Sequence, residues 1–169
     1  MEQQMDKLWL EALVSLTAWL KRNQWKIATA ESCTGGMVAE ALTRLPGSSA
    51  WFERGFITYS NESKQQMLGV DPEVFRSQGA VSQVCVEQMA RGALSHSNAD
   101  VSIAVSGIAG PDGGSEEKPV GTVWLAWAQM KSGQVWVHSE VFLFEGDRQQ
   151  IRQQATLAAL KGVGKFFHN

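Results

Sequence analysis

The alternation of short strands and amphipathic helices along the first two thirds of the chain is the feature that most constrains its fold. Apolar residues recur there at helical spacing, and β-branched runs bounded by turn residues indicate strands. Helices are predicted over 5–22, 35–45, 61–68, 83–97 and 147–166, strands over 26–32, 55–60 and 100–107, and a hairpin over 121–130 and 134–144. Alternating strands and helices favour parallel strand pairs, and a hairpin adds antiparallel ones. The pattern predicts a single three-layer α/β/α domain over 1–169 with a mixed, mostly parallel sheet.

Capping residues mark where three of these helices begin. Ser60 or Asn61 suits the cap of the third expected helix, and Ser82 suits that of the fourth. Asp147, followed three residues later by Gln150, resembles a capping box at the start of the last helix. These signals support the expected boundaries independently of the apolar pattern.

Composition excludes several classes of protein. With 44% apolar and 19% charged residues, the 169-residue chain has the make-up of an ordinary globular domain. No apolar run approaches the roughly 18 residues of a membrane-spanning helix, and the N-terminus has acidic residues where a signal peptide would be basic. Cys33 and Cys85 are too far apart for a disulfide framework or a metal-ligand cluster. We therefore expect a cytoplasmic protein that holds no metal and binds no membrane.

The charge distribution argues against a nucleic-acid partner. Fifteen basic residues stand against 17 acidic ones, giving a net charge of −2, and no basic block occurs. Proteins that bind nucleic acids usually carry a clustered positive surface, because they neutralise phosphates. The charge distribution therefore favours a small-molecule ligand.

Three polar turns follow three of the expected strands. They come after Ala30, after Tyr59 and after Val105. In open α/β sheets, ligands bind outside the carboxyl ends of the strands. The sequence therefore predicts that these three turns converge on one site.

The turn TAESCTGG (29–36) places two potential nucleophiles, Ser32 and Cys33, before a pair of glycines. A turn that leads from a strand into a helix can present a reactive group and free backbone N–H donors together. The same composition also makes an ordinary tight turn. Composition and position alone do not decide between the two nucleophiles.

A nucleophile of this kind needs a base. His96, His138 and His168 lie in positions without an obvious orienting partner. A partly desolvated lysine is the other precedent, and Lys64 follows a strand-end segment that would bring it near the glycine turn. A solvated surface lysine is the alternative.

Two further features suggest an anion-binding function. The glycine-rich segment SGIAGPDGG (106–114) offers backbone N–H groups that can cradle an anion, although it is not a P-loop. Arg148, at the start of the last helix, can clamp a phosphate or carboxylate. The alternative for the glycine-rich segment is a long loop without function. The alternative for Arg148 is an ordinary surface arginine.

Four motifs in order resemble a known family. TAESCTGG, GSSAWFERGFITYSNESK, SGIAGPDGGSEEKPVGTVW and EGDR together are similar to the CinA C-terminal-domain family, in particular its stand-alone nicotinamide-nucleotide amidohydrolases (NMN deamidases). The resemblance extends from about residue 10 to 165. Larger CinA proteins carry an additional N-terminal domain associated with ADP-ribose pyrophosphatase activity and a metal, and neither is implied for this chain.

The resemblance implies an activity and a set of site residues. It implies hydrolysis of the carboxamide of nicotinamide mononucleotide to nicotinate mononucleotide and ammonia, in pyridine nucleotide salvage, without a cofactor. It also implies a serine–lysine dyad, carried over onto Ser32 and Lys64. The N–H groups of the turn formed by Cys33, Thr34, Gly35 and Gly36 are then the expected oxyanion donors. Other expected contacts to the nucleotide come from Thr34, Ser48, Tyr59, Ser106, Gly107, Asp112 and Arg148.

Two functions from other classes remain open at this level. A non-catalytic nucleotide-binding or regulatory module would keep the glycine turns but would not need Ser32 or Lys64. An RNA-binding module would suit the sheet architecture but not the acidic balance. The sequence also leaves open whether the protein is a homo-oligomer and whether a neighbouring subunit completes the site.

Overall fold

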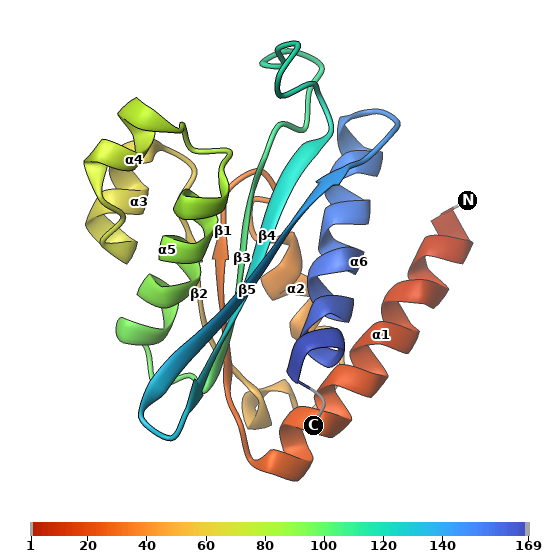
Figure 1. Ribbon diagram of the computed structural model, residues 1–169. Helices are drawn as coiled ribbons and strands as arrows, with labels where there is room; N and C mark the ends of the chain where they lie inside the picture. Colours follow the sequence, from red (N-terminus) through yellow and green to blue (C-terminus); the bar gives the residue numbers. More distant parts are fainter. Residues whose placement is uncertain (1, 168–169) are drawn as a thin grey trace.

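The computed structural model describes residues 2–167 as a central sheet with helices on both faces (Figure 1). The strands are β1 (Ile27–Glu31), β2 (Phe52–Ile57), β3 (Val101–Gly107), β4 (Thr122–Lys131) and β5 (Gln134–Leu143). The helices are α1 (Glu2–Asn23), α2 (Met37–Leu42), α3 (Asn61–Leu68), α4 (Pro72–Ser77), α5 (Gln83–Ser95) and α6 (Arg148–Phe167), with a 3₁₀ turn at Ser48–Ala50.

The sheet has the order β2-β1-β3-β4-β5. β1 pairs in parallel with both β2 and β3, whereas β4 is antiparallel to β3 and to β5. The predicted mixed sheet is therefore confirmed. Four of the five strands point the same way, although the neighbouring pairs divide equally between parallel and antiparallel.

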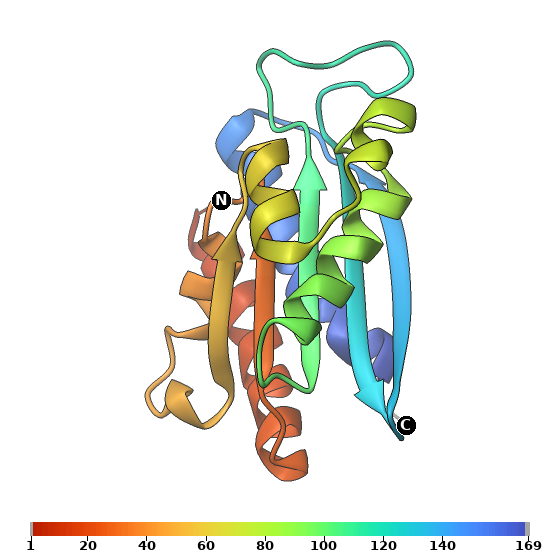
Figure 2. The same ribbon diagram turned by 90° about the vertical axis from the view of Figure 1, so that its left-hand side faces the viewer.

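The two faces of the sheet differ in the size of their side chains. On the face covered by α1, α2 and α6, large residues such as Ile103, Leu125 and Trp127 fill the core. On the face covered by α5, the sheet presents mainly alanines, and the buried Ser102 hydroxyl donates to the carbonyl of Ala90 at 2.8 Å. Small side chains allow a helix backbone to approach the sheet closely, so α5 lies directly against β3 and β4 (Figure 2).

The predicted caps are present, but two elements differ in extent. Ser60 caps α3 in a capping box, Ser82 caps α5, and Asp147 and Gln150 exchange hydrogen bonds at the start of α6. β2 ends three residues earlier than expected, because the chain must leave the sheet for Ser60 to cap α3.

The helix expected over 35–45 is confined to Met37–Leu42. Gly35 and Gly36 have φ values of +58° and +105°, which are left-handed conformations that an α-helix does not include. The short helix α4 was not expected from the apolar pattern. Asp71 caps it and Pro72 occupies its first position, both of which are common signals of a helix start.

Gly162 in α6 is required by the packing of Trp127. A Cβ atom at this position would lie 2.1 Å from two carbons of the indole, whose Nε1 donates to the carbonyl of Ala159 at 2.8 Å. Neither the buried ring nor the helix can move without breaking this contact.

We expect Gly162→Ala to destabilise the protein by about 1–3 kcal/mol through overpacking, although alanine is favoured over glycine in a helix by about 1 kcal/mol. Urea unfolding measures the difference. Replacing Trp127 by Phe in the Gly162→Ala background should recover part of the loss, since the smaller ring leaves room. A Gly162→Ala protein as stable as the unaltered chain would contradict this account.

Candidate active site

The site lies where the chain changes direction across the sheet. From β1 the chain passes first to β2 on one side and later to β3 on the other, so the carboxyl end of β1 is a topological switch point. The N–H of Ser32 donates to the main-chain carbonyl of Val105 at 3.0 Å, and the N–H of Thr58 donates to the main-chain carbonyl of Glu31 at 2.8 Å. The three strands end at the same edge of the sheet (Figure 2), and the three predicted turns converge there.

A cavity of about 300 Å³ occupies this edge. Its walls come from the turn after β1, the start of α3, the segment before α5, the loop after β3 and the start of α6. The lining residues are Ser32, Cys33, Tyr59, Asn61, Lys64, Ala80, Val81, Ser106, Gly107, Ile108, Ala109, Gly110, Asp112, Gly113 and Arg148.

Ser32 and Lys64 are in contact at the base of this cavity. Lys64 Nζ lies 3.0 Å from Ser32 Oγ, and it donates to the carbonyl oxygens of Thr58 at 2.7 Å and Tyr59 at 3.3 Å. Helix α3 positions the lysine one turn after its Ser60 cap, so that the side chain runs back beneath the end of β2. The two residues, 32 positions apart in the sequence, thus form a hydrogen-bonded pair.

Burial changes the acid–base behaviour of Lys64. The residue is 1% exposed, and loss of hydration lowers the pKa of its amine below the ordinary lysine value. None of the ion pairs found among residues 2–167 involves this lysine. Compared with a solvated lysine, the equilibrium is shifted toward the neutral amine, which is the form that can accept a proton.

Burial makes the thiol of Cys33 less reactive. Burial raises the pKa of its thiol to about 11, which opposes formation of the reactive thiolate at neutral pH. Its side chain packs in the core between the sheet and the helices of the α6 face. Of the two adjacent candidates, only Ser32 has a hydrogen-bonded partner that can take its proton.

The backbone donors of the turn are only partly available. The N–H groups of Cys33 and Thr34 have no hydrogen-bond acceptor among residues 2–167. The N–H of Gly35, which we expected to be a third oxyanion donor, instead donates to the carbonyl of Ser32 at 3.0 Å. The role of Gly35 is therefore structural, since this bond closes the turn. Of the two residues with an unpaired N–H, only Cys33 lines the cavity.

The buried carboxylate of Glu31 holds the turn from below. It accepts hydrogen bonds from the Thr34 hydroxyl at 2.6 Å and from the N–H groups of Gly36, Val38 and Ala39 at 3.1, 3.0 and 2.9 Å. Negative charge at a helix N-terminus is favourable, because the free N–H groups there carry partial positive charge. The Thr34 hydroxyl and the Gly36 N–H are engaged here and do not face the cavity.

Arg152 of α6 holds the same turn from the other side. Its Nε donates to the carbonyl of Cys33 and its Nη2 to that of Thr34, both at 3.1 Å. With their carbonyls fixed, the peptide planes of the turn are oriented from both sides. Neither Glu31 nor Arg152 was expected from the sequence. A carboxylate beside two glycines is a visible signal for the first, whereas nothing local marks the second.

The rim of the cavity is polar. Arg148 donates from Nη1 to the carbonyl of Gly110 at 2.8 Å and from Nη2 to the Tyr59 hydroxyl at 2.9 Å, so it joins three segments across the opening. Asn61 and Asp112 line the cavity and make no side-chain hydrogen bond within residues 2–167. The sequence drew attention to Tyr59, Asp112 and Arg148, and it missed Asn61 as a wall residue.

The other predicted contacts divide into two groups. Ser106 and Gly107 line the cavity, but the buried Ser106 hydroxyl donates to the carbonyl of Ala80 at 2.8 Å and so builds the wall. Thr34, Gly35 and Gly36 face a different hollow, shared with α1 and α6. Ser48 lies in the 3₁₀ turn before β2, at the opposite end of the sheet, so the structure does not bring it into the site.

The histidines and acidic residues build no second centre within the described chain. Neither His96 nor His138 lines the cavity, and His168 lies outside the described residues. Among residues 2–167, no three His, Cys, Asp or Glu side chains are grouped to hold a metal ion. No helix in that range is long and apolar enough to span a membrane.

Fold and site together define an α/β domain with a buried serine–lysine pair at its switch point. Residues 11–167 match the family model described as the CinA C-terminal domain. The chain therefore belongs to the CinA C-terminal-domain family, as its four motifs suggested.

Individual relatives cover most of the chain. It is 56% identical over 144 residues to the nicotinamide-nucleotide amidohydrolase PncC of Pseudomonas putida, covering 85% of this chain and 88% of that protein. It is 54% identical over 148 residues to PncC of Escherichia coli K12, covering 88% of each. The crystal structure of a competence damage-inducible protein A from Klebsiella pneumoniae superposes with a TM-score of 0.87 at 36% identity, covering 94% of this chain and 96% of that one.

The role of Glu31 predicts a stability effect. In Glu31→Gln, either orientation of the amide turns an NH₂ group toward N–H donors that need an acceptor. We expect a loss of about 1–3 kcal/mol for each buried donor left unpaired, measured by urea unfolding. The matched control is Glu40→Gln, at an exposed position of α2, the helix whose first N–H groups donate to Glu31. This control should change stability by less than about 1 kcal/mol. Equal stability of the two variants would contradict the proposed role.

Proposed function

We propose that this protein hydrolyses the carboxamide of nicotinamide mononucleotide, giving nicotinate mononucleotide and ammonia, with Ser32 as nucleophile and Lys64 as base. The observation that carries the proposal is the 3.0 Å contact between Lys64 Nζ and Ser32 Oγ in a buried setting. The identity to two enzymes named nicotinamide-nucleotide amidohydrolase, which extends over more than four fifths of the chain, supports the choice of substrate. We place the reaction in the cytoplasm, in pyridine nucleotide salvage.

Lys64 Nζ has three polar contacts, with Ser32 Oγ and with the carbonyls of Thr58 and Tyr59. In the reactive state that we propose, the amine is neutral. A neutral amine has two N–H bonds and one lone pair. The carbonyls of Thr58 and Tyr59 accept the two hydrogens, which directs the lone pair toward Ser32 Oγ. In this state the amine accepts the Ser32 proton as Oγ attacks the amide carbon.

The turn after β1 then serves the transition state. Attack forms the Oγ–C bond and moves negative charge onto the amide oxygen, where the N–H of Cys33, a residue that lines the cavity, is available as a donor. Protonated Lys64 returns the proton to the amide nitrogen, the C–N bond breaks and ammonia leaves. Water hydrolyses the resulting acyl-enzyme by the same proton route and restores the Ser32 hydroxyl.

Polar groups on the rim suit a nucleotide. Arg148 supplies positive charge for the phosphate, and Asp112 and Asn61 are free to bind ribose hydroxyls. The cavity of about 300 Å³ is of the size that small ligands occupy. The bond between Arg148 and the Tyr59 hydroxyl sets the width of the opening.

The nucleophile assignment predicts different outcomes at adjacent positions. Ser32→Ala should reduce turnover of nicotinamide mononucleotide at least about 10³-fold, because no covalent intermediate can form. Cys33→Ala should keep most activity, since the residue acts through its backbone N–H. Release of ammonia from the purified protein measures both. An inactive Cys33→Ala protein beside an active Ser32→Ala protein would reverse the assignment.

The base assignment predicts a pH dependence. Lys64 must be neutral to accept the proton, so the rate should rise with pH through an apparent pKa below that of free lysine, about 10.4. The direction follows from the lowered pKa of the buried amine. Lys64→Arg keeps a cation that cannot act as base, and it should lose about 10²–10⁴-fold in kcat, as Lys64→Ala should.

The pH–rate profile and the two Lys64 variants are measured with the same ammonia assay. Circular dichroism of each variant separates loss of the base from loss of the fold. A folded and active arginine variant would leave Lys64 without a role in proton transfer.

A further inference from the structure

The outer edge of β5 is not paired with any strand of residues 2–167. β5 is ten residues long and lies at the margin of the sheet, and no helix or loop of residues 2–167 covers its outer side (Figure 2). Exposed strand edges promote association with other chains, so proteins usually protect them.

The hairpin turn determines which main-chain groups of β5 face outward. Lys131 and Gln134 are opposite each other across the two-residue turn Ser132–Gly133, and both turn residues have positive φ. In such a turn the closing pair exchanges both hydrogen bonds, and hydrogen-bonded pairs then alternate along the ladder. The even-numbered residues of β5 therefore bond to β4. The odd-numbered residues present free N–H and C=O groups at the edge, and they are Val135, Val137, Ser139, Val141 and Leu143.

The outward-facing positions of this edge lack the usual protection. The residues whose main chain faces outward include no lysine, proline or glycine. Trp136, Val141 and Leu143 are 55%, 52% and 65% exposed. The opposite edge of the sheet differs in length, because β2 has six residues and β5 has ten.

We propose that β5 pairs antiparallel with β5 of a second copy of this chain, about a twofold axis at Ser139. The strand is self-complementary in this register, which places outward-facing residues opposite one another as hydrogen-bonded pairs. Val137 then faces Val141 of the partner subunit, and Val135 faces Leu143 of the partner subunit. The two sheets join into one of ten strands.

Polar side chains also meet in the same register. His138 lies opposite Glu140 of the partner subunit, and the twofold axis repeats this pair. The intervening pairs are not hydrogen-bonded through the main chain, so their side chains approach more closely. The imidazole of His138 is stacked on Phe166 at 4.7 Å between ring centroids, which holds the ring on this face. Each Glu140 also pairs with Lys165 of its own chain.

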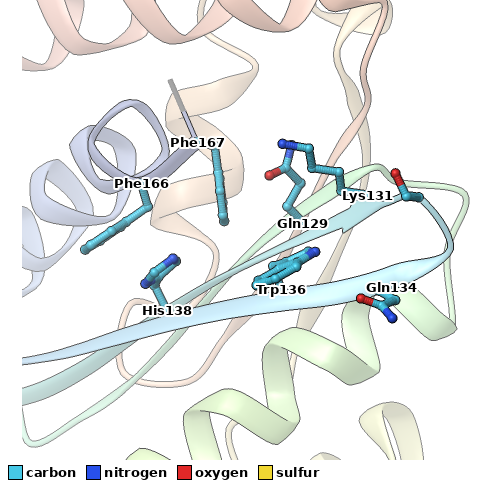
Figure 3. Close-up of a pocket in the computed structure, with 8 residues that line it drawn as sticks. Gln129, Lys131, Gln134, Trp136, His138, Phe166 and Phe167 are labelled. Atoms are coloured by element: carbon cyan, nitrogen blue, oxygen red, sulfur yellow. The ribbon is translucent and has the colours of Figure 1, made fainter. Parts of the chain in front are cut away.

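A hollow beside the β4–β5 hairpin lies next to the proposed interface. It has a volume of about 300 Å³, and Trp136, His138, Phe166 and Phe167 lie around it (Figure 3). In the proposed register Trp136 faces Phe142 of the partner subunit, and Gln134 faces Phe144 of the partner subunit. Phe142 and Phe144 are stacked on each other on the face of the sheet that this hollow shares. An aromatic pair thus lies next to an aromatic-lined hollow, twice in the dimer.

Sedimentation equilibrium tests the interface. The unaltered protein should sediment at twice the mass of one chain. The double variant Val141→Lys, Leu143→Lys should sediment as a monomer, because the side chains are already exposed in one chain and the lysines disfavour edge pairing. Leu10→Lys, Val14→Lys, which alters equally exposed residues of α1, is the matched control and should stay dimeric. A monomeric unaltered protein, or a dimeric Val141→Lys, Leu143→Lys protein, would overturn the proposal.

A cysteine at the axis tests the register. In Ser139→Cys the two thiols face each other across the axis at about 5.5 Å between Cα atoms, within the range of a disulfide. Oxidation should convert this variant to a covalent dimer, seen as doubled mass on a non-reducing gel. In Val137→Cys each thiol faces Val141 of the partner subunit, four residues away from the other thiol along the strand. This variant should not cross-link. The native Cys33 and Cys85 are buried, so the unaltered protein is the background control. Cross-linking at position 137 and not at 139 would overturn the register.

Discussion

The bonds of the buried Glu31 carboxylate are the interaction on which the site depends. The last residue of the central strand satisfies the first N–H groups of the following helix, and it also fixes the Thr34 hydroxyl. The first turn of a helix normally obtains such bonds from a capping side chain or from water. Here Glu31 supplies the acceptor from the core side of the turn, so the cavity side stays free for Ser32 and for the N–H of Cys33. Arg152 completes the arrangement by holding the carbonyls of the same peptides.

The burial of Lys64 beside Ser32 is unfavourable for the charged amine but suits a residue that accepts a proton. Burying an amine without a carboxylate partner is unfavourable for its charged form, and that penalty is the source of the lowered pKa. The carbonyls of Thr58 and Tyr59 keep the amine hydrogen-bonded without adding negative charge. A carboxylate in their place would hold the proton on the lysine. With neutral acceptors in that place, burial sets the direction in which the pKa of Lys64 is shifted.

The two ends and two edges of the sheet serve different purposes. The carboxyl ends of β1, β2 and β3 hold the cavity, because three loops of different origin meet there. The antiparallel strands β4 and β5 contribute no residue to its lining. They extend the sheet away from the site and leave an unprotected edge on that side. Pairing through β5 would therefore leave the cavity open, and the chemistry and the assembly can be separated by mutation.

Local sequence was enough to determine the type and order of most elements, the caps at Ser60, Ser82 and Asp147, and the glycine turn after β1. These features follow from residue spacing and backbone preference within a few positions. They also indicated a site at the strand ends, and the family resemblance pointed to Ser32 and Lys64. Ser48 was wrongly expected near them, and Gly35 was wrongly expected to be a free donor, because neither strand direction nor bond partners are visible in local pattern.

Tertiary structure alone decided which groups meet. β1 lies between β2 and β3, and only this order brings Lys64 beneath Ser32 and buries it. The contact with Lys64 also distinguished Ser32 from Cys33, since both residues are buried and Lys64 Nζ is hydrogen-bonded to Ser32 Oγ. Arg152 reaches the turn from 119 residues further along the chain. Contacts of this range depend on the order of strands in the sheet, and that order is set by the packing of the whole core.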